Sequence, residues 1–187
     1  MNVVIFGPPG AGKGTQANNI VKKYNLYQVS TGDLLRAEVK NQTEVGKVIE
    51  NIISKGDFAT DEIVNDLIKE VIFDPNKKNK LIFDGYPRSL TQAENLDALL
   101  NKSSQKIDFI FFLNVKKETI IKRIEKRKIL ENRTDDNHST ILKRYDTYME
   151  TTKPVLNFYS KKTNFYEIDG DEKIDEISRK IEEILSV

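Results

Sequence analysis

The stretch Gly7-Pro8-Pro9-Gly10-Ala11-Gly12-Lys13-Gly14-Thr15 carries the residue types and spacing that most clearly predict chemistry in this sequence. It follows the apolar run Val3-Val4-Ile5-Phe6 and opens a stretch that we expect to be helical. Glycines let the backbone curl so that several N–H groups face one anion, and the helix N-terminus adds partial positive charge. Lys13 would reach the β- and γ-phosphates of a nucleoside triphosphate. A glycine-rich turn without a ligand is the alternative, but the lysine, the spacing and the strand-to-helix context favour a phosphate-binding loop.

The loop departs from the general pattern at one position, which bears on the metal. The pattern asks for Ser or Thr directly after the lysine, whereas this chain has Gly14 there and Thr15 next. We therefore expect Mg²⁺ to be held mainly by phosphate oxygens and waters. Asp84 ends the apolar run 81–83, where a buried carboxylate needs a charged partner, so we expect it to be an outer-shell acceptor for the metal. The alternative is a capping or turn aspartate.

Arginines are few, and their positions are informative. Of the 30 basic residues only seven are arginine, and a planar, bidentate grip on phosphate needs a guanidinium group. Six lie in or beside segments expected at one edge of a sheet or in two irregular pieces; they are Arg36, Arg88, Arg123, Arg127, Arg133 and Arg144. Phosphoryl transfer needs such a concentration, because the transferring group spreads charge over three oxygens. Arg123 and Arg127 are four residues apart and share a helix face, for which a solvated basic face is the alternative.

Residues for other kinds of catalysis are scarce. The single histidine, His138, follows Asp135-Asp136-Asn137 near an expected helix start and reads as a surface or capping residue. No Ser-His-Asp set, cysteine nucleophile or histidine metal cluster can be assembled. Transfer to a phosphate needs no general base, because the nucleophile is already an anionic oxygen. The sequence therefore favours a phosphate acceptor over an alcohol.

Short apolar runs alternate with helical stretches, which predicts an α/β fold. The expected strands are 2–6, 27–29, 81–84, 107–113 and 165–168, and the expected helices lie near 13–24, 31–41, 44–54, 61–73, 90–100, 116–129, 136–160 and 173–185. Several strands are apolar at successive positions, which is typical of strands buried on both faces of a parallel sheet. The alternation implies right-handed crossovers and three layers. Ligands bind beyond the carboxyl ends of such strands, where Gly7, Ser30 and Asp84 follow the first three.

Length and composition exclude several classes of protein. The 187 residues suggest one compact domain with small inserts. A net charge of +1 indicates no nucleic-acid partner and no anionic membrane surface. The absence of cysteine excludes disulfides and thiolate metal sites, and fits a reducing compartment. No apolar run approaches the length of a membrane span or a signal sequence, so we expect a soluble, cytoplasmic protein.

Four motifs, in order and in register, resemble the adenylate kinase family. They are GPPGAGKGTQ (7–16), STGDLLR (30–36), DGYPRSLTQAE (84–94) and NRTDD…KRY (132–145), and the resemblance runs from residue 1 to about 170. It implies a three-layer P-loop NTPase fold with a five-stranded parallel sheet flanked by helices. The core would be 1–29, 60–125 and 137–187, with a nucleoside-monophosphate-binding insert at 30–59 and a short lid at 126–136. The implied activity is reversible transfer of the γ-phosphoryl group of Mg-ATP to AMP, giving two ADP, by a monomeric enzyme.

The resemblance also implies which residues bind each nucleotide. The ATP phosphates would lie on Gly10, Ala11, Gly12, Lys13, Gly14 and Thr15, with Arg123 over the adenine, Arg127 at a phosphate, and Gly170 and Glu172 offering backbone to the adenine. AMP would be bound by Thr31, Gly32, Arg36, Asp57, Phe58, Ala59, Gly85, Tyr86, Pro87, Arg88 and Gln92, with Arg36 and Arg88 on its phosphate. The lid arginines Arg133 and Arg144 would close on the transferring group, and Asp135 and Asp136 would form the lid hinge. The implied catalytic set is Lys13, Arg88, Arg127, Arg133 and Arg144.

Several alternatives stay open at the level of sequence. A UMP/CMP kinase of the same fold typically carries a small apolar residue and an Asn-type reader where this chain has Thr31 and Gln92. Both 30–33 and 89–92 also read as capping boxes, so Gln92 could serve only as a cap. An ATP-binding switch would keep the loop and lose the acceptor arginines, and an alcohol kinase would need a base such as Asp33. Long-lid relatives sometimes hold zinc with lid cysteines; this short, cysteine-free lid leads us to expect no structural zinc.

Overall fold

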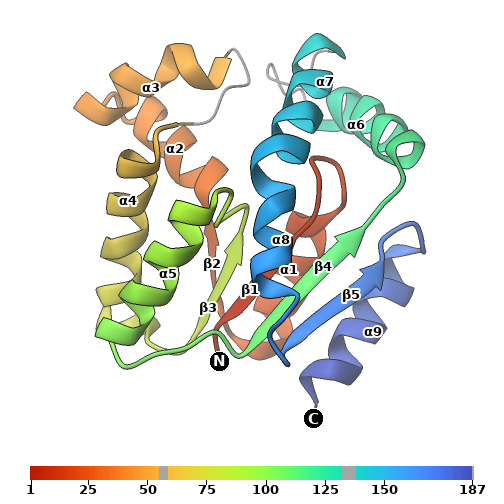
Figure 1. The fold of residues 1–187 in the computed structure, drawn as a ribbon. Coiled ribbons are helices and arrows are strands. Elements are labelled where there is room, and N and C mark those ends of the chain that lie inside the picture. The colour runs from red at the N-terminus through yellow and green to blue at the C-terminus, as the bar shows by residue number, and fades with distance from the viewer. Residues whose placement is uncertain (55–58, 132–137, 187) are drawn as a thin grey trace.

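A sheet of five parallel strands forms the centre of the protein in this computed structural model, which describes residues 1–54, 59–131 and 138–186 (Figure 1). For residues 53–54, 127–131 and 138–141 it describes the backbone only. The strands are β1 (Val3–Phe6), β2 (Tyr27–Ser30), β3 (Leu81–Asp84), β4 (Phe109–Asn114) and β5 (Phe165–Asp169), in the spatial order β2-β3-β1-β4-β5. The predicted strands and their parallel arrangement are confirmed.

Strand β1 shows why successive positions are apolar. All four of its residues are buried, and their side chains alternate between the two cores of the protein. Val4 and Phe6 belong to one core, and Val3 and Ile5 belong to the other. Because side chains of a strand point alternately to opposite faces, a sheet covered on both faces needs apolar residues at every position.

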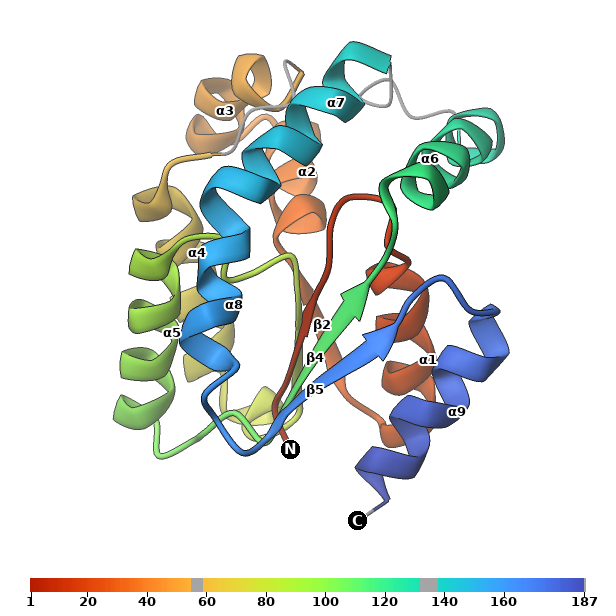
Figure 2. The ribbon, with the colours of Figure 1, turned by 45° about the vertical axis from the view of Figure 1, so that its right-hand side comes forward.

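Helices cover both faces of the sheet, which gives the predicted three layers. Figure 2 shows α4 (Asp61–Phe73), α5 (Leu90–Lys102) and α8 (Lys153–Tyr159) on one side, and α1 (Lys13–Tyr24) and α9 (Ile174–Leu185) on the other. The first core includes Ile68, Leu96 and Tyr159, all fully buried. The second includes Ala17 and Ile181 from α1 and α9.

Four further helices extend beyond the carboxyl ends of the strands (Figure 1). They are α2 (Thr31–Lys40), α3 (Glu44–Ser54), α6 (Lys117–Glu131) and α7 (His138–Thr147), and a short 3₁₀ turn, η1 (Pro75–Lys77), follows α4. Helices α2 and α3 pack closely, since a Cβ on Gly46 would lie 2.0 Å from the backbone oxygen of Glu38. Within the described ranges, no helix has the length and apolar character needed to cross a membrane.

The predicted helix 136–160 is wrong as a single α-helix. The structure divides this part of the chain into α7, a π-helical turn, η2 (Tyr148–Thr152), and α8. Proline at position 154 has no N–H to donate to the carbonyl of residue 150, and its ring would collide with that carbonyl in a regular α-helix. The wider turn accommodates it, with the Lys153 N–H donating to the Tyr148 carbonyl instead.

Candidate active site

A cleft of about 820 Å³ lies at the carboxyl edge of the sheet, within the range typical of small-molecule sites. The loop after β1 lines one part of it, and residues after β2 and β3 line another. Side chains from α6, α7 and η2 also line the cleft. The predicted residues Lys13, Thr31, Asp84, Arg88, Gln92, Arg123 and Arg144 are all among the lining residues.

The phosphate-loop residues adopt backbone conformations that require glycine at two positions. Gly12, which precedes the first turn of α1, has φ +93°, and Gly10 has φ +82°. A Cβ on Gly10 would also lie 2.7 Å from the Ile124 side chain on α6. No described side chain caps the N-terminus of α1, as expected for a helix start that binds an anion.

Lys13 folds back over this loop. Its Nζ donates hydrogen bonds to the backbone carbonyls of Gly7, at 2.8 Å, and Pro8, at 3.1 Å. The ammonium group is therefore held above the curled backbone, on the side of the cleft where phosphates would lie.

Asp84 ends β3 beside the phosphate loop. One carboxylate oxygen lies 3.5 Å from the position that a Cβ would take on Gly14, and it accepts a hydrogen bond from Gln28 Nε2 at 3.1 Å. Among the described residues there is no cluster of three metal-ligating side chains. A single carboxylate fits a Mg²⁺ ion held mainly by phosphate oxygens and waters.

Three arginines, Arg36, Arg88 and Arg144, line the same cleft. The pKa of Arg88 is lowered to about 10: burial is the largest cause, the like charges of Arg144 and Arg36 add to it, and Asp84 acts in the opposite direction. A dianion bound in the cleft would relieve the repulsion that Arg88 experiences from the other two arginines. Arg36 forms an ion pair with the exposed Asp33 on the same helix.

Arg88 is tied to the ends of β2 and β3. Its Nε donates to the Gly85 carbonyl at 2.7 Å, and an Nη donates to the Thr31 hydroxyl at 3.4 Å. Thr31 in turn donates to the same carbonyl at 2.9 Å. Gly85 has φ +77°, and a Cβ there would lie 2.9 Å from the guanidinium group. Gly32 lies against the guanidinium of Arg36 in a similar way, at 3.2 Å for a Cβ.

For both predicted capping boxes, the structure confirms the serine as the N-cap residue of its helix. The Ser30 hydroxyl accepts from the Asp33 N–H at the start of α2, and the Ser89 hydroxyl accepts from the Gln92 N–H at the start of α5. The side chain of Gln92 does something else: its Oε1 accepts from the Arg88 N–H at 2.7 Å, and its Nε2 donates to Asp61 at 2.7 Å. The cap therefore uses the serine and leaves the Gln92 amide in the wall of the cleft.

In the turn after β3, the side chains of Tyr86 and Pro87 lie in different environments. Pro87 lines the cleft, whereas the Tyr86 side chain is buried in the core beside Phe83 and bonds to Asn65 and Asn95. Burial raises the pKa of the Tyr86 hydroxyl to about 12. Its side chain therefore lies behind the site rather than in it.

On the donor side, Arg123 bridges the phosphate loop and the loop after β5. It donates to the carbonyls of Ala11, at 3.3 Å, and Gly170, at 2.8 Å. A Cβ on Gly170 would lie 2.4 Å from the Val115 side chain, so only glycine fits this approach. Glu172 is paired with Lys180 of α9.

Some predicted site residues fall outside the described part of the chain. These are Asp57, Phe58, Arg133, Asp135 and Asp136, and the side chain of Arg127 belongs with them. Ala59, at the edge of the first gap, is buried and lines the cleft.

Sequence reasoning missed several residues of the site. Gln28, Thr152 and Gln16 line the cleft, and Asp61 holds both Gln92 and Ser89. Asp61 follows the N-cap residue Thr60 of α4, so in the sequence it reads as an ordinary acidic residue of a first helical turn. Its partners lie 28 and 31 residues away along the chain, and no local signal marks them.

Comparison with known proteins agrees with the motifs. A family model described as adenylate kinase matches residues 5–164. A protein from Pelagibacter ubique named adenylate kinase is 49% identical over 213 aligned positions, covering 100% of both chains. Proteins of the same name from Caulobacter sp. and Archaeoglobus fulgidus are 38% and 36% identical, and each alignment covers at least 98% of both chains. These names do not favour the UMP/CMP kinase alternative.

Proposed function

The chain belongs to the adenylate kinase family, and from that premise we propose that it transfers the γ-phosphoryl group of Mg-ATP to AMP, reversibly, to give two ADP. The observation that carries the proposal is the convergence of Arg36, Arg88 and Arg144 in the cleft that also contains the phosphate loop. A binding switch would need only the loop. The arginines add a site for a second phosphate, opposite the first.

The donor binds on the phosphate loop. The N–H groups of Gly10 to Thr15 and the ammonium group of Lys13 bind the ATP phosphates. To do so, Lys13 exchanges its carbonyl partners for phosphate oxygens, which are stronger acceptors. Arg123 covers the adenine and Arg127 contacts a phosphate, while the backbone of Gly170 and Glu172 borders the base.

The acceptor binds with its phosphate on Arg36 and Arg88. Thr31, Gly32, Gly85, Pro87 and Gln92 form the described part of its pocket, together with Ala59, and residues 57 and 58 complete it. Arg36 exchanges Asp33 for the phosphate. An oxygen of this phosphate attacks the γ-phosphorus, the bond from that phosphorus to the β,γ-bridging oxygen breaks, and ADP leaves. Arg144 and Arg133 stabilise the charge on the transferring group.

Mg²⁺ accompanies ATP and neutralises charge on its phosphates. Asp84 would hold the ion through waters, a role that the position of its carboxylate beside Gly14 supports. Gln28 fixes that carboxylate from the other side.

Residues 30–59 act as the AMP-binding insert and 126–136 as a short lid, whose closure excludes water from the transfer. We further propose that the enzyme works as a cytoplasmic monomer without structural zinc.

The test is an acceptor panel of AMP, CMP, UMP, GMP and dAMP with Mg-ATP, following ADP formation and its reversal. Fast turnover with AMP, dependent on Mg²⁺ and reversible from ADP, is expected. A preference for CMP or UMP would retain the phosphate chemistry but reject Thr31 and Gln92 as readers of adenine. Absence of acceptor-dependent ADP would reject the proposal.

A further inference from the structure

We infer that Asp61 is a positioning residue, whose carboxylate fixes the orientation of the Gln92 side-chain amide and thereby the choice of acceptor base. The inference rests on the proposed function, because it takes Gln92 as the side chain that meets the base of AMP. Asp61 lies at the start of α4, and Gln92 lies in the first turn of α5.

Both polar atoms of the Gln92 amide have fixed partners. Nε2 donates to Asp61 Oδ1 at 2.7 Å, and Oε1 accepts from the Arg88 backbone N–H at 2.7 Å. The other oxygen of Asp61 accepts from the Ser89 hydroxyl at 2.8 Å. Ser89 is the N-cap of α5, so the carboxylate is itself anchored to the helix that carries Gln92.

These two partners specify a single orientation of the amide. A carboxylate only accepts hydrogen bonds, and a backbone N–H only donates them. A flipped amide would place its oxygen against Asp61 and its NH₂ group against the Arg88 N–H, losing both bonds. One N–H and one oxygen lone pair of Gln92 remain for a ligand, and Gln92 is 4% exposed and lines the cleft.

The fixed orientation distinguishes 6-amino from 6-oxo purines. Adenine presents an acceptor at N1 and a donor at its 6-amino group, which match the remaining N–H and oxygen of Gln92. Hypoxanthine and guanine present the reverse pattern, a donor at N1 and an acceptor at O6. They would pair well only with a flipped amide, which Asp61 and the Arg88 N–H oppose.

Asp61 could instead serve only to join α4 to α5. Another set of hydrogen bonds, however, already joins these two helices. One turn further along, the buried Tyr86 hydroxyl donates to Asn65 of α4 at 2.7 Å and accepts from Asn95 of α5 at 3.2 Å. The two helices are therefore connected without Asp61. What Asp61 adds is the contact with the Gln92 amide.

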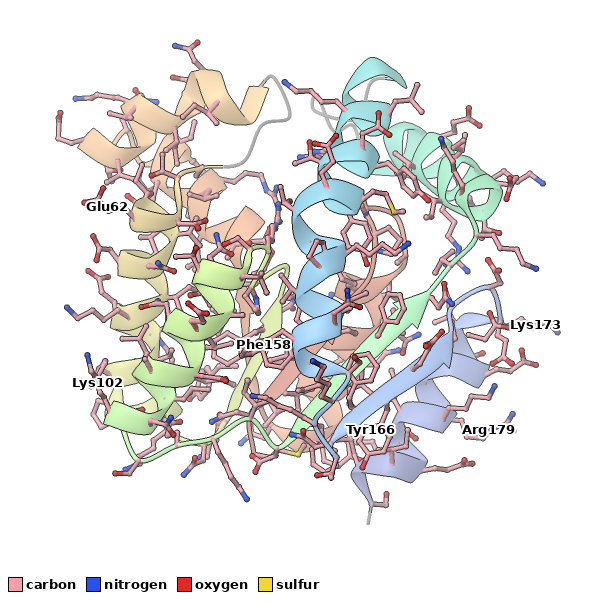
Figure 3. All side chains as sticks on the ribbon, in the orientation of Figure 1. Glu62, Lys102, Phe158, Tyr166, Lys173 and Arg179 are labelled. Atoms are coloured by element: carbon pink, nitrogen blue, oxygen red, sulfur yellow. The ribbon has the colours of Figure 1, made fainter. Side chains whose placement is uncertain are left out.

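Glu62 provides a matched control. Asp61 and Glu62 both lie in the first turn of α4, where a negative charge stabilises a helix. Glu62 is exposed and points outward from the helix (Figure 3). Asp61→Asn and Glu62→Gln each remove one charge from this turn, but only the first changes the partner of Gln92.

The experiment compares AMP with inosine monophosphate as acceptors at saturating Mg-ATP. For Asp61→Asn we expect the KM for AMP to rise on the order of tenfold, as for loss of a hydrogen bond to a charged group, while the KM for ATP stays within about twofold. The selectivity for AMP, as a ratio of kcat/KM values, should fall several-fold. Glu62→Gln should change none of these values. The melting temperature of each variant verifies that it folds. If Asp61→Asn is unstable, Asp61→Ser replaces it in the same comparison.

A double-mutant cycle separates positioning from a structural role. If Asp61 acts through Gln92, then Asp61→Asn should reduce AMP selectivity little further in a Gln92→Ala background. Additive losses, or unchanged selectivity in Asp61→Asn, would overturn the inference even where Gln92→Ala confirms Gln92 as the reader. Unchanged selectivity in Gln92→Ala itself would instead reject the role that the proposed function gives Gln92.

Discussion

Replacing Arg88 with methionine is expected to stabilise the substrate-free protein while removing acceptor binding. Burial is the largest cause of the lowered pKa of Arg88, followed by the charge of Arg144, and together with the other charges they bring it down to about 10. A cation with a lowered pKa destabilises the folded state as long as it is charged. A shift of this size corresponds to about 3 kcal/mol at neutral pH.

Lost hydrogen bonds offset part of this gain. The bond from Arg88 Nε to the Gly85 carbonyl is short, at 2.7 Å, and the one to Thr31 is long, at 3.4 Å. Together they contribute about 2 kcal/mol, with the short bond dominant. The Gly85 carbonyl keeps the Thr31 hydroxyl as a donor at 2.9 Å, so it is not left unpaired. The net gain is therefore at most about 1 kcal/mol, which corresponds to a rise in Tm of up to about 2–4 °C.

Thermal and urea unfolding, with and without AMP, measure both parts of this prediction. Saturating AMP should stabilise the wild type, by about 2.7 kcal/mol at a hundredfold excess over Kd, and should leave Arg88→Met unchanged. Arg179→Met is the control, because Arg179 is exposed on α9 and points away from the protein (Figure 3). It should alter neither stability nor the response to AMP.

The pH dependence gives an independent check. The unfolded chain keeps the Arg88 proton to a higher pH than the folded protein, in which the pKa of Arg88 is lowered to about 10. Between the two pKa values the unfolded state binds more protons, so this group makes wild-type stability rise with pH. The advantage of Arg88→Met should therefore shrink as pH rises through about 10. The reasoning is refuted if Arg88→Met is less stable than the wild type at neutral pH while Arg179→Met is not.

Three further changes test the loop, the packing and the metal. Lys13→Met should lower turnover by at least about 10³-fold, as expected for a main charge-stabilising group, with little change in Tm; near-normal turnover in an ADP assay would exclude the role of Lys13. Gly46→Ala should lower the free energy of urea unfolding by about 1–3 kcal/mol, because its Cβ would overlap the Glu38 carbonyl, and an unchanged midpoint would contradict this packing argument. Chelation of Mg²⁺ should abolish turnover, and Asp84→Asn should raise the Mg²⁺ concentration needed for half-maximal activity; a wild-type Mg²⁺ titration of that variant would reject Asp84 as an outer-shell acceptor.

The fold was predictable where its determinants are local. The run Val3-Val4-Ile5-Phe6, apolar at every position, required a strand covered on both faces, and β1 is one. The glycines and lysine of the loop after it predicted a helix N-terminus, and α1 begins at Lys13. Proline at 154 was also visible, but the helical pattern on either side of it concealed the π-helical turn.

The candidate site was predictable where residue type is rare, and not where partners are distant. Arginines stand out in a lysine-rich chain, so Arg36, Arg88 and Arg144 could be singled out before their positions were known. Asp61 could not, because its role depends on the packing of α4 against α5. For Tyr86 the motif predicted a residue of the site. Its neighbours in the turn line the cleft, but its side chain packs in the core. The sequence alone does not reveal whether a side chain in this turn points to the cleft or to the core.

The helix termini at the cleft show how one motif can both cap a helix and contribute side chains to a binding site. Ser30 and Ser89 bond to their own helices, which leaves the neighbouring Thr31 and Gln92 side chains to contact other groups. Helix α1, by contrast, has no side-chain cap among the described residues, and its N–H groups need an acceptor from elsewhere. A phosphate satisfies that need, whereas a base requires a polar group with a fixed orientation. Which helices at the cleft are capped by their own sequence therefore decides where backbone N–H groups and where polar side chains face a ligand.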